Sequence, residues 1–454
     1  RTVLSLAPEL RFMASRRRFL SSVAATGAAF HIVPRHVLGR GFTAPSDTIR
    51  VAAIGAGGKG ESDITGIEKA GASIAALCDV DWRAARKSFG RYPQARRFKD
   101  YREMLDVMGS EIDAVSVSTP DHTHAVATMA ALKLKKPVFT QKPLTRTLHE
   151  VRTLMAAAKA SGLPTQMGNQ GHAGVGTRVI REWYEAGAIG EIREIHYWSN
   201  RPIWPQGIDR PTEAHNPHPT FDWNLWLGPA PDRPYSPVYA PFRWRGWWDY
   251  GTGALGDIAC HAMDAAFWAF DLRNPTRITP ESSQRYEETA PKQSRVEYEF
   301  PARGARPAVK VVWRDGSLWP AKPPELGEYD EWPIGEVGGQ MWVGTEGAMV
   351  ADAYGDNTRI LNPTRHAQFT KTPPKPKYAR SPGVYAEWIN AITGKGPQPM
   401  SSFAEHAGPL TEMVLYGCLA VRAGQVIELG PDGSVKTNVP AEYVTPVYRE
   451  GWTL

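Results

Sequence analysis

Residues 49–60 read IRVAAIGAGGKG and indicate how the first part of the chain folds. The apolar run predicts a buried strand, and the G-x-G-x-x-G spacing after it predicts a tight turn into a helix. In such a turn the glycines permit the bend, the approach of a pyrophosphate to the backbone, and close packing of helix on strand. We therefore expect a dinucleotide at this helix N-terminus, against Gly55, Gly57, Gly58 and Gly60.

Asp79 strengthens this interpretation because it stands where the next strand is expected to end. Apolar residues 72–78 predict that strand, and Asp79 follows Gly55 by 24 positions. A carboxylate at about this spacing binds the ribose hydroxyls of NAD and repels the 2′-phosphate of NADP. The pattern therefore favours NAD, while Arg83 leaves NADP open. Capping of a helix is the structural alternative for Asp79.

Strand and helix patterns alternate from residue 48 to residue 167. Further apolar strands are expected at 114–117 and 138–140, with a helical run at 124–134 between them. Strands that alternate with helices at this spacing form a parallel sheet covered by helices on both faces. We therefore predict an α/β Rossmann domain, a doubly wound parallel sheet, over residues 48–167.

The pattern changes after residue 168, where longer alternating segments and proline-rich loops replace it. We predict an α+β C-terminal domain over residues 168–430 with a large, open, mostly antiparallel sheet, followed by a tail over 431–454. An open sheet favours self-association, so we expect a homo-oligomer that forms through it. The expected strands lie near 191–197, 296–300, 309–313, 340–343 and 348–351, and the expected helices near 257–270, 383–393 and 403–423.

The charge of the chain is concentrated in its first 40 residues, which carry seven basic side chains and one acidic one. This excess equals the formal net charge of +6, so residues 41–454 are close to neutral. A neutral body without a basic stripe gives no electrostatic reason to bind nucleic acid.

Residues 15–20, SRRRFL, match the twin-arginine export pattern, and the weakly apolar stretch after them is too short to span a bilayer. We interpret residues 1–47 as a twin-arginine leader, so we expect an exported, periplasmic protein with no stable membrane anchor. A basic tail without a targeting role is the alternative.

The cysteines and histidines do not follow the spacing of a disulfide framework or a metal site. The three cysteines, Cys78, Cys260 and Cys418, lie far apart among apolar residues, which is typical of buried thiols. A metal held by His122 and His124 is an alternative that we do not favour. We therefore expect no metal.

Three further motifs carry candidate chemistry: TPDHTH at 119–124, QKP at 141–143 and GALGDIACH at 253–261. Together with the glycine-rich turn they resemble the Gfo/Idh/MocA oxidoreductases, the group of glucose–fructose oxidoreductase and inositol dehydrogenase. The resemblance covers nearly all of residues 48–430. The stretches 200–207 and 222–229 resemble an exported branch of that family.

The resemblance implies three catalytic residues, Lys142, Asp257 and His261, because the family places the lysine of E-K-P and a D-x-x-x-H pair around the reacting carbinol. Hydride removal from an alcohol needs a base for the hydroxyl proton, and an imidazole titrates near neutral pH. Lys142 can stabilise negative charge on the same oxygen. Asp257 lies four residues before His261 on one helix face, where it can bind substrate hydroxyls or orient the histidine.

Gln141 departs from the family pattern, which has a glutamate before the lysine. A neutral amide can still hydrogen-bond the nicotinamide region, but it contributes no charge, so the protonation of the lysine stays open. We expect the cofactor to contact Thr119, His122, Gln141 and Lys142.

Two groups of residues are candidates for binding substrate. GNQGH at 168–172 follows a sixth strand, at the edge where ligands bind in open parallel sheets. Seven of the 16 tryptophans lie between 198 and 248, and indole rings pack on the apolar faces of sugar rings. For each tryptophan, core packing is the alternative. The candidates are Asn169, Gln170, His172, Arg201, Trp204, Trp248 and Tyr250.

These observations predict an NAD(P)-dependent oxidoreductase that transfers hydride between a carbinol of a sugar or polyol and a tightly bound cofactor. Two alternatives stay open. Because an exported enzyme must regenerate its cofactor in place, the net reaction could be glycoside hydrolysis through transient oxidation to a 3-keto sugar and elimination. The second alternative is a non-catalytic sugar-binding protein, which only Gln141 supports.

Overall fold

The computed structural model describes residues 48–454 except 328, 329, 334 and 336. The predicted leader, residues 1–47, lies outside the described residues. In the described part of the chain, every helix is too short or too polar to cross a membrane.

The first sheet has six strands, all parallel, in the order β3-β2-β1-β4-β5-β6. The order reverses at β1, so the crevice for a ligand opens beyond the carboxyl ends of β1 and β4. Burial is continuous over residues 51–54 of β1 and through all of β4 because helices cover both faces of the sheet. The strands are β1 (Arg50–Ile54), β2 (Ser73–Cys78), β3 (Arg96–Phe98), β4 (Ala114–Val117), β5 (Val138–Thr140) and β6 (Thr165–Met167).

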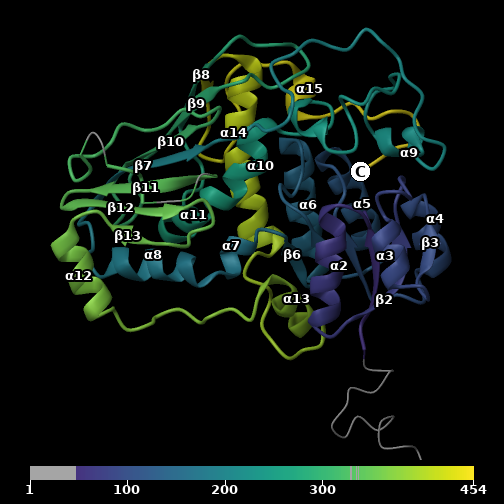
Figure 1. Cartoon of the computed structure of the whole chain (residues 1–454), viewed down its shortest axis with the longest axis horizontal. Helices are drawn as coiled ribbons and strands as arrows, with labels where there is room; N and C mark the ends of the chain where they lie inside the picture. Colours follow the sequence, from purple (N-terminus) through teal and green to yellow (C-terminus); the bar gives the residue numbers. More distant parts are fainter. Residues whose placement is uncertain (1–47, 328–329, 334, 336) are drawn as a thin grey trace, which may run out of the picture. The chain divides into compact units, whose positions relative to one another are not determined.

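Five helices connect these strands, and side chains cap the N-termini of two of them, α4 and α6. Asp100 accepts the backbone N–H of Arg102, and Thr147 forms a reciprocal capping box with Glu150. Purple α2 and blue α5 lie beside the sheet in Figure 1. The helices are α2 (Lys59–Lys69), α3 (Arg86–Arg91), α4 (Tyr101–Met108), α5 (Asp121–Lys133) and α6 (Leu148–Ser161).

The second sheet has eight strands in the order β13-β12-β11-β7-β10-β9-β8-β14. Every neighbouring pair is antiparallel except β7 and β10, which are parallel. The predicted fold class, a Rossmann sheet plus an α+β part with a large and mostly antiparallel sheet, is therefore confirmed. The strands are β7 (Ile192–Ser199), β8 (Arg277–Ser282), β9 (Ser294–Phe300), β10 (Val309–Arg314), β11 (Gly338–Gly344), β12 (Gly347–Asp352), β13 (Arg359–Ile360) and β14 (Ile427–Glu428).

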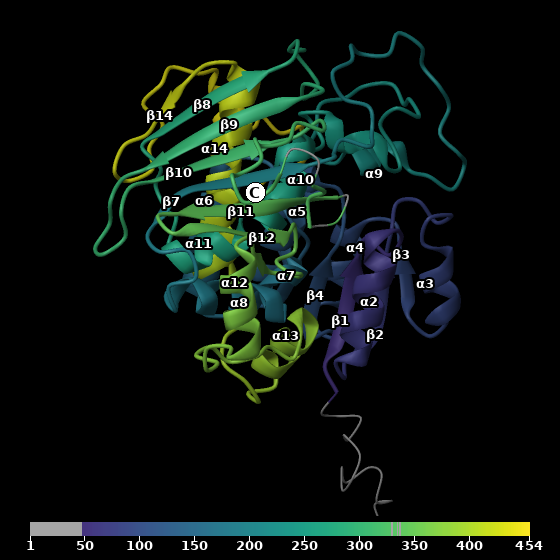
Figure 2. The same ribbon diagram turned by 60° about the vertical axis from the view of Figure 1, so that its left-hand side comes forward.

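Helices cover one face of this sheet, and the long α14 lies behind strands β8 and β9 in Figure 2. The single helix predicted at 257–270 is wrong: α10 begins at Gly253, and the chain breaks at Met263 before α11. Asp264 opens α11 and turns its carboxylate toward His172 and His406. The helices are α7 (Gln170–Ala173), α8 (Val175–Glu185), α9 (Trp223–Leu227), η2 (Arg243–Gly246), α10 (Gly253–Ala262), α11 (Asp264–Phe270), α12 (Pro363–Lys371), α13 (Val384–Ile392), η3 (Phe403–Ala407), α14 (Gly408–Ala423) and α15 (Ala441–Val444).

Two late segments of the chain return to the first sheet. Helix α13 packs Trp388 and Ile389 against Val51 of β1 and Phe139 of β5. The C-terminal tail brings Trp452 over the guanidinium of Arg102 on α4, 4.3 Å from the ring centre. The surroundings of the parallel sheet are therefore built from residues far apart in the sequence.

Candidate active site

The glycine-rich turn between β1 and α2 approaches its neighbours too closely for side chains. A Cβ on Gly55 would lie 2.6 Å from the carbonyl oxygen of Ser118, and one on Gly60 would lie 1.9 Å from that of Gly55. Gly55 also has a φ of +85°, which L side chains rarely adopt. The turn thus carries no side chain at Gly55, Gly57, Gly58 and Gly60, which leaves the backbone at the start of α2 open to the approach of a pyrophosphate.

Asp79 is attached to this turn. Its Oδ2 accepts the backbone N–H groups of Ala56 and Gly57, both at 2.9 Å, and its Oδ1 accepts that of Asp81 at 2.8 Å. Burial raises the pKa of Asp79 to about 6, and these hydrogen bonds oppose the rise. Nearby Arg83 pairs with Asp81, so its charge is partly engaged.

A cavity of about 530 Å³ opens beside the turn. Asp79, Thr119 and the glycine-rich turn form one side of it. The opposite side comes from the aromatic loops that follow β7 and from the C-terminal tail. The aromatic lining residues are Phe221, Trp226, Phe242, Trp244 and Trp452, together with Tyr101 of α4.

Lys142 and Asp257 form a buried ion pair at the end of β5. The Lys142 ammonium donates to Asp257 Oδ1 at 2.9 Å and to the Asp257 carbonyl oxygen at 2.8 Å. Arg245, which lines the cavity, donates to the same Oδ1 at 3.2 Å. Burial opposes ionisation of Asp257, but the charges of Lys142 and Arg245 outweigh it and lower the pKa of Asp257 to about 2.

His261 lies one helical turn after Asp257 on α10 and is also buried. Burial, followed by the charge of Lys142, lowers the pKa of His261 to about 3. Its ring lies 4.9 Å from that of Tyr354, and no described residue hydrogen-bonds its buried Nδ1. The imidazole is therefore neutral near pH 7.

Gln141 is held by a buried carboxylate. Its Nε2 donates to Asp63 Oδ2 at 2.9 Å, and Ser118 Oγ donates to the same oxygen at 2.8 Å. Tyr385 OH and the ammonium of Lys59 bind the other oxygen of Asp63. The negative charge missing at position 141 is thus present on α2, in contact with the amide that replaces it.

Comparison with known proteins identifies the family. The family described as "Oxidoreductase family, NAD-binding Rossmann fold" matches residues 49–169, and the one described as "Oxidoreductase family, C-terminal alpha/beta domain" matches residues 201–308. Both are Gfo/Idh/MocA families, and they match in the order in which the two sheets follow one another.

The chain belongs to the Gfo/Idh/MocA oxidoreductase family.

Relatives of this Gfo/Idh/MocA chain include sugar and polyol dehydrogenases. It is 30% identical over 171 residues to inositol 2-dehydrogenase of Arthrobacter sp. (strain FB24), covering 36% of this chain and 49% of that protein. It is 29% identical over 178 residues to levoglucosan dehydrogenase of Pseudarthrobacter phenanthrenivorans, covering 38% of this chain and 37% of the relative. The chain therefore spans half or less of the length of these relatives.

Solved structures share the fold. The WlbA dehydrogenase from Bordetella pertussis, in complex with NADH and UDP-GlcNAcA, has a TM-score of 0.57 at 16% identity, covering 84% of this chain and 99% of that one. Aldose-aldose oxidoreductase from Caulobacter crescentus, complexed with glycerol, has a TM-score of 0.54 at 16% identity, covering 84% and 100%.

The other predicted site residues of this Gfo/Idh/MocA chain do not all line the cavity. His122 is buried outside the cavity, with Nε2 2.9 Å from the Trp226 carbonyl oxygen and Nδ1 3.3 Å from that of Tyr250. Burial lowers the pKa of His122 to about 3. Tyr250 itself is fully buried in the aromatic cluster. Trp248 lines a separate small cavity.

The remaining predicted substrate residues form two groups. Asn169 and His172 are buried and bound to Asp264, and Gln170 opens α7 beside them. Trp204 donates its indole N–H to Gln206, and Arg201 donates to Asn200. The first group follows β6, whereas the second belongs to the loop after β7, so the structure does not gather all seven candidates into one lining.

Several site residues escaped the sequence analysis of this Gfo/Idh/MocA chain. Arg245 shares Asp257 with Lys142, Asp63 holds Gln141, and His406 shares Asp264 with His172. Asp63 carries one available signal, because a carboxylate four residues after Lys59 shares its helix face. Contacts between distant segments, such as that of His406, have no comparable local signal.

Proposed function

We propose that the chain is an NAD-dependent oxidoreductase that moves a hydride between a carbinol carbon of a sugar or polyol and a tightly bound nicotinamide cofactor. The observation that supports it best is the pairing of Lys142 with Asp257, one helical turn from a neutral and buried His261. The dehydrogenases among the relatives support the same reaction class.

The glycine-rich turn fits the cofactor because Gly55 and Gly60 leave no room for side chains, and Asp79 lies at the cavity wall. When bound, NAD⁺ supplies the hydride acceptor. Residues Gly55, Gly57, Gly58 and Gly60 would hold its pyrophosphate, and Asp79 its ribose.

The chain's own residues supply the proton chemistry. His261 is neutral, so its free ring nitrogen can accept the proton of the substrate hydroxyl as the hydride leaves the carbon. The Lys142 ammonium stabilises the negative charge that develops on the same oxygen. Asp257 holds that ammonium in place through two contacts, which fixes its position before substrate binds.

Activity and bound cofactor together test the proposal. Native mass spectrometry of the purified full chain should release NAD or NADH, and a panel of sugars and polyols should yield product with an absorbance change of the nicotinamide. Lys142→Met and His261→Gln should each lower kcat by about 10²- to 10⁴-fold. Lys159→Met, at an exposed position of α6, is the matched control and should leave kcat unchanged.

Each alternative predicts a different result. Release of sugar from a glycoside without net NADH would assign the chain to glycoside hydrolysis through a 3-keto intermediate. An unchanged kcat in Lys142→Met, or full-length protein that binds sugar but neither carries nor binds a nicotinamide cofactor, would contradict the oxidoreductase proposal.

We propose that the protein is exported by the twin-arginine route and acts in the periplasm. The SRRRFL motif at 15–20 supports this. Fractionation of cells that express the full chain should find it in the periplasm, and the Arg16→Lys/Arg17→Lys double variant should stay in the cytoplasm. Equal distribution of both proteins would contradict the proposal.

We further propose that the chain forms a homo-oligomer through the open face of the eight-stranded sheet. The breadth of that sheet, with β13 and β14 as its edges, supports this. Light scattering after size exclusion should give a multiple of the chain mass, whereas a monomer at micromolar concentration would contradict it.

A further inference from the structure

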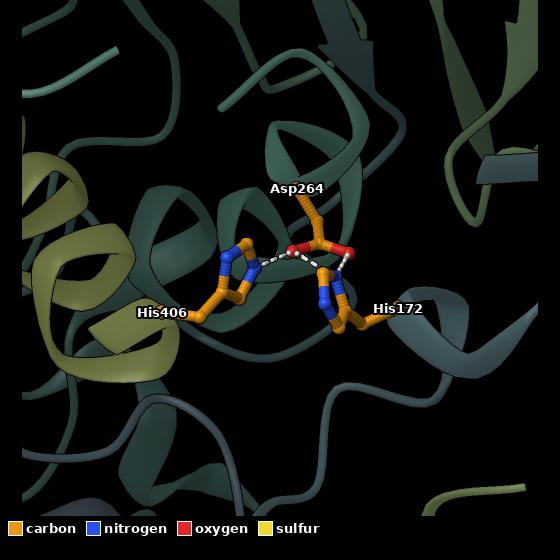
Figure 3. Close-up of side chains that lie close together, drawn as sticks. All are labelled: His172, Asp264 and His406. Atoms are coloured by element: carbon orange, nitrogen blue, oxygen red, sulfur yellow. Dashed lines mark hydrogen bonds and ion pairs between the residues drawn. The ribbon is translucent and has the colours of Figure 1, made fainter. Parts of the chain in front are cut away.

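Three buried side chains converge at Asp264, which lies three residues after His261 in the sequence. His172 belongs to α7, Asp264 opens α11, and His406 lies in η3; Figure 3 shows both rings directed at the carboxylate. His172 Nδ1 lies 2.8 Å from Asp264 Oδ2, and His406 Nε2 lies 2.5 Å from Oδ1. The ligand atoms of all three residues lie within 4.8 Å of one another.

The carboxylate of Asp264 is bound by two imidazoles, which are cations only when they are protonated. Its side chain is 2% exposed, and no lysine or arginine of the described residues pairs with it. Its remaining contact is neutral, from the amide of Asn169 at 3.3 Å. A buried carboxylate normally pairs with a cation or a metal ion, because burying the charge alone is costly.

One ring nitrogen in the cluster is also left over. Nε2 of His172 is buried and has no hydrogen-bond partner in the described part of the chain. An unpaired polar atom in a protein interior costs about 1–3 kcal/mol. The ring is stacked on that of His406, with centres 3.9 Å apart, and Nδ1 of His172 and Nε2 of His406 both contact the Asp264 carboxylate.

We propose that His172, Asp264 and His406 bind one divalent first-row transition-metal ion. Two imidazoles and one carboxylate are ligands that zinc, iron(II), cobalt(II) and manganese(II) accept, and three protein ligands leave a position open. Ligand atoms bonded at about 2.0–2.2 Å lie roughly 3.0–3.5 Å apart, so small movements of these side chains create the site. The ion would place a permanent positive charge beside Asp264, where the imidazoles are charged only when protonated.

Asn169 completes the surroundings of this site. Its amide nitrogen contacts Asp264, and its oxygen accepts the hydroxyl of Ser401 at 2.5 Å. Outer partners of this kind orient the ligands of metal sites. The ion would join α7, α11 and η3. Asp264 lies 92 residues after His172 and 142 residues before His406. The sequence indicated no metal because these ligands share no local spacing.

The wild-type full chain gives the first test, and it does not depend on the redox reaction. Protein purified with a tag that contains no histidine is treated with EDTA, desalted, and titrated separately with Zn²⁺ and Co²⁺. Mass spectrometry of the metals should find one ion retained per chain, Co²⁺ should give visible d–d absorption, and Zn²⁺ should raise Tm.

Variants locate the ion. His172→Ala, Asp264→Ala and His406→Ala should each weaken Zn²⁺ binding by at least about 100-fold, and Asn169→Ala should weaken it by about 10-fold. His149→Ala, which removes an exposed histidine of α6, is the control and should bind as the wild type does. Circular dichroism of each variant establishes that it is folded.

Two outcomes would overturn the proposal. Folded wild-type protein that retains only substoichiometric zinc, cobalt, iron and manganese at micromolar free ion has no such site. Stoichiometric binding that survives in a folded His172→Ala/His406→Ala double variant would place the ion elsewhere. Because the readouts are metal content and Tm, an inactive but metal-loaded protein would leave this inference standing while contradicting the proposed reaction.

Discussion

The contact between Gln141 and Asp63 yields the sharpest prediction, because an amide stands here at the position where the family pattern has a glutamate. Gln141 Nε2 donates to Asp63 Oδ2 at 2.9 Å, and the Asp63 side chain is fully buried. In Gln141→Glu a carboxylate oxygen replaces that donor. Restoring the family residue should therefore damage this protein, although the same residue serves its relatives.

The size of the effect follows from the distance between the two groups. Two unit charges about 3 Å apart repel by about 5–6 kcal/mol at an effective dielectric constant of about 20. The ammonium of Lys59 contacts the other oxygen of Asp63 and offsets part of this repulsion. We therefore expect Gln141→Glu to lower the free energy of unfolding at pH 7.5 by about 2–4 kcal/mol.

A double-mutant cycle measures the interaction by denaturant unfolding. In Asp63→Asn/Gln141→Glu the amide and the carboxylate exchange places, so the double variant should recover at least half of the lost stability. Gln368→Glu, at an exposed position of α12, should change stability by less than about 0.5 kcal/mol. The reasoning is refuted if Gln141→Glu is as stable as the wild type, or if Asp63→Asn restores nothing.

Three further predictions concern the same region. Burial, followed by the charge of Asp257, raises the pKa of Asp121 to about 7, so the folded chain loses stability as pH rises from about 4 to 7. Asp121→Asn should remove this loss. The unfolding free energy of the variant, relative to that of the wild type, should therefore grow by roughly 2–3 kcal/mol between pH 5 and 7.5. Equal stability of the two proteins at every pH would contradict this assignment. Arg245→Met should raise the pKa of Asp257 from about 2, which moves the acid limb of the kcat profile to higher pH, whereas an unmoved limb would show that Lys142 alone sets that pKa. Trp452→Ala removes an aromatic side chain from the cavity lining, so it should weaken NAD binding, measured by calorimetry, by about 2- to 12-fold. Unchanged affinity would contradict the placement of NAD in this cavity.

The sequence predicted the features that depend on local pattern. Four of the six strands of the parallel sheet, β1, β2, β4 and β5, were expected at nearly the observed residues, because apolar runs between helices determine them. The short strand β3 was not predicted. The glycine-rich turn could be predicted because its geometry is encoded in consecutive residues. Lys142, Asp257 and His261 were found through the family's motifs, and the structure brings Lys142 and Asp257 into contact.

The features that depend on distant contacts were not predicted. Position 141 shows a missing charge, but only the packing of α2 against β5 reveals that Asp63, 78 residues earlier, supplies it. From the sequence, the side chains of the tryptophan-rich loops fitted two roles equally well, substrate binding and core packing. Tyr250 proved to be fully buried, because indole and phenol rings bury large apolar areas in either role.

The charges around the candidate active site favour an anion at one place. Lys142 and Arg245 share the single carboxylate of Asp257, and burial keeps His261 neutral. Asp121 carries only part of a negative charge near pH 7, because its pKa is raised to about 7. The two cations therefore outweigh the carboxylates beside a neutral base. This combination stabilises an alkoxide while leaving a nitrogen free to take the proton that creates it, which is what removal of a hydride from a carbinol demands.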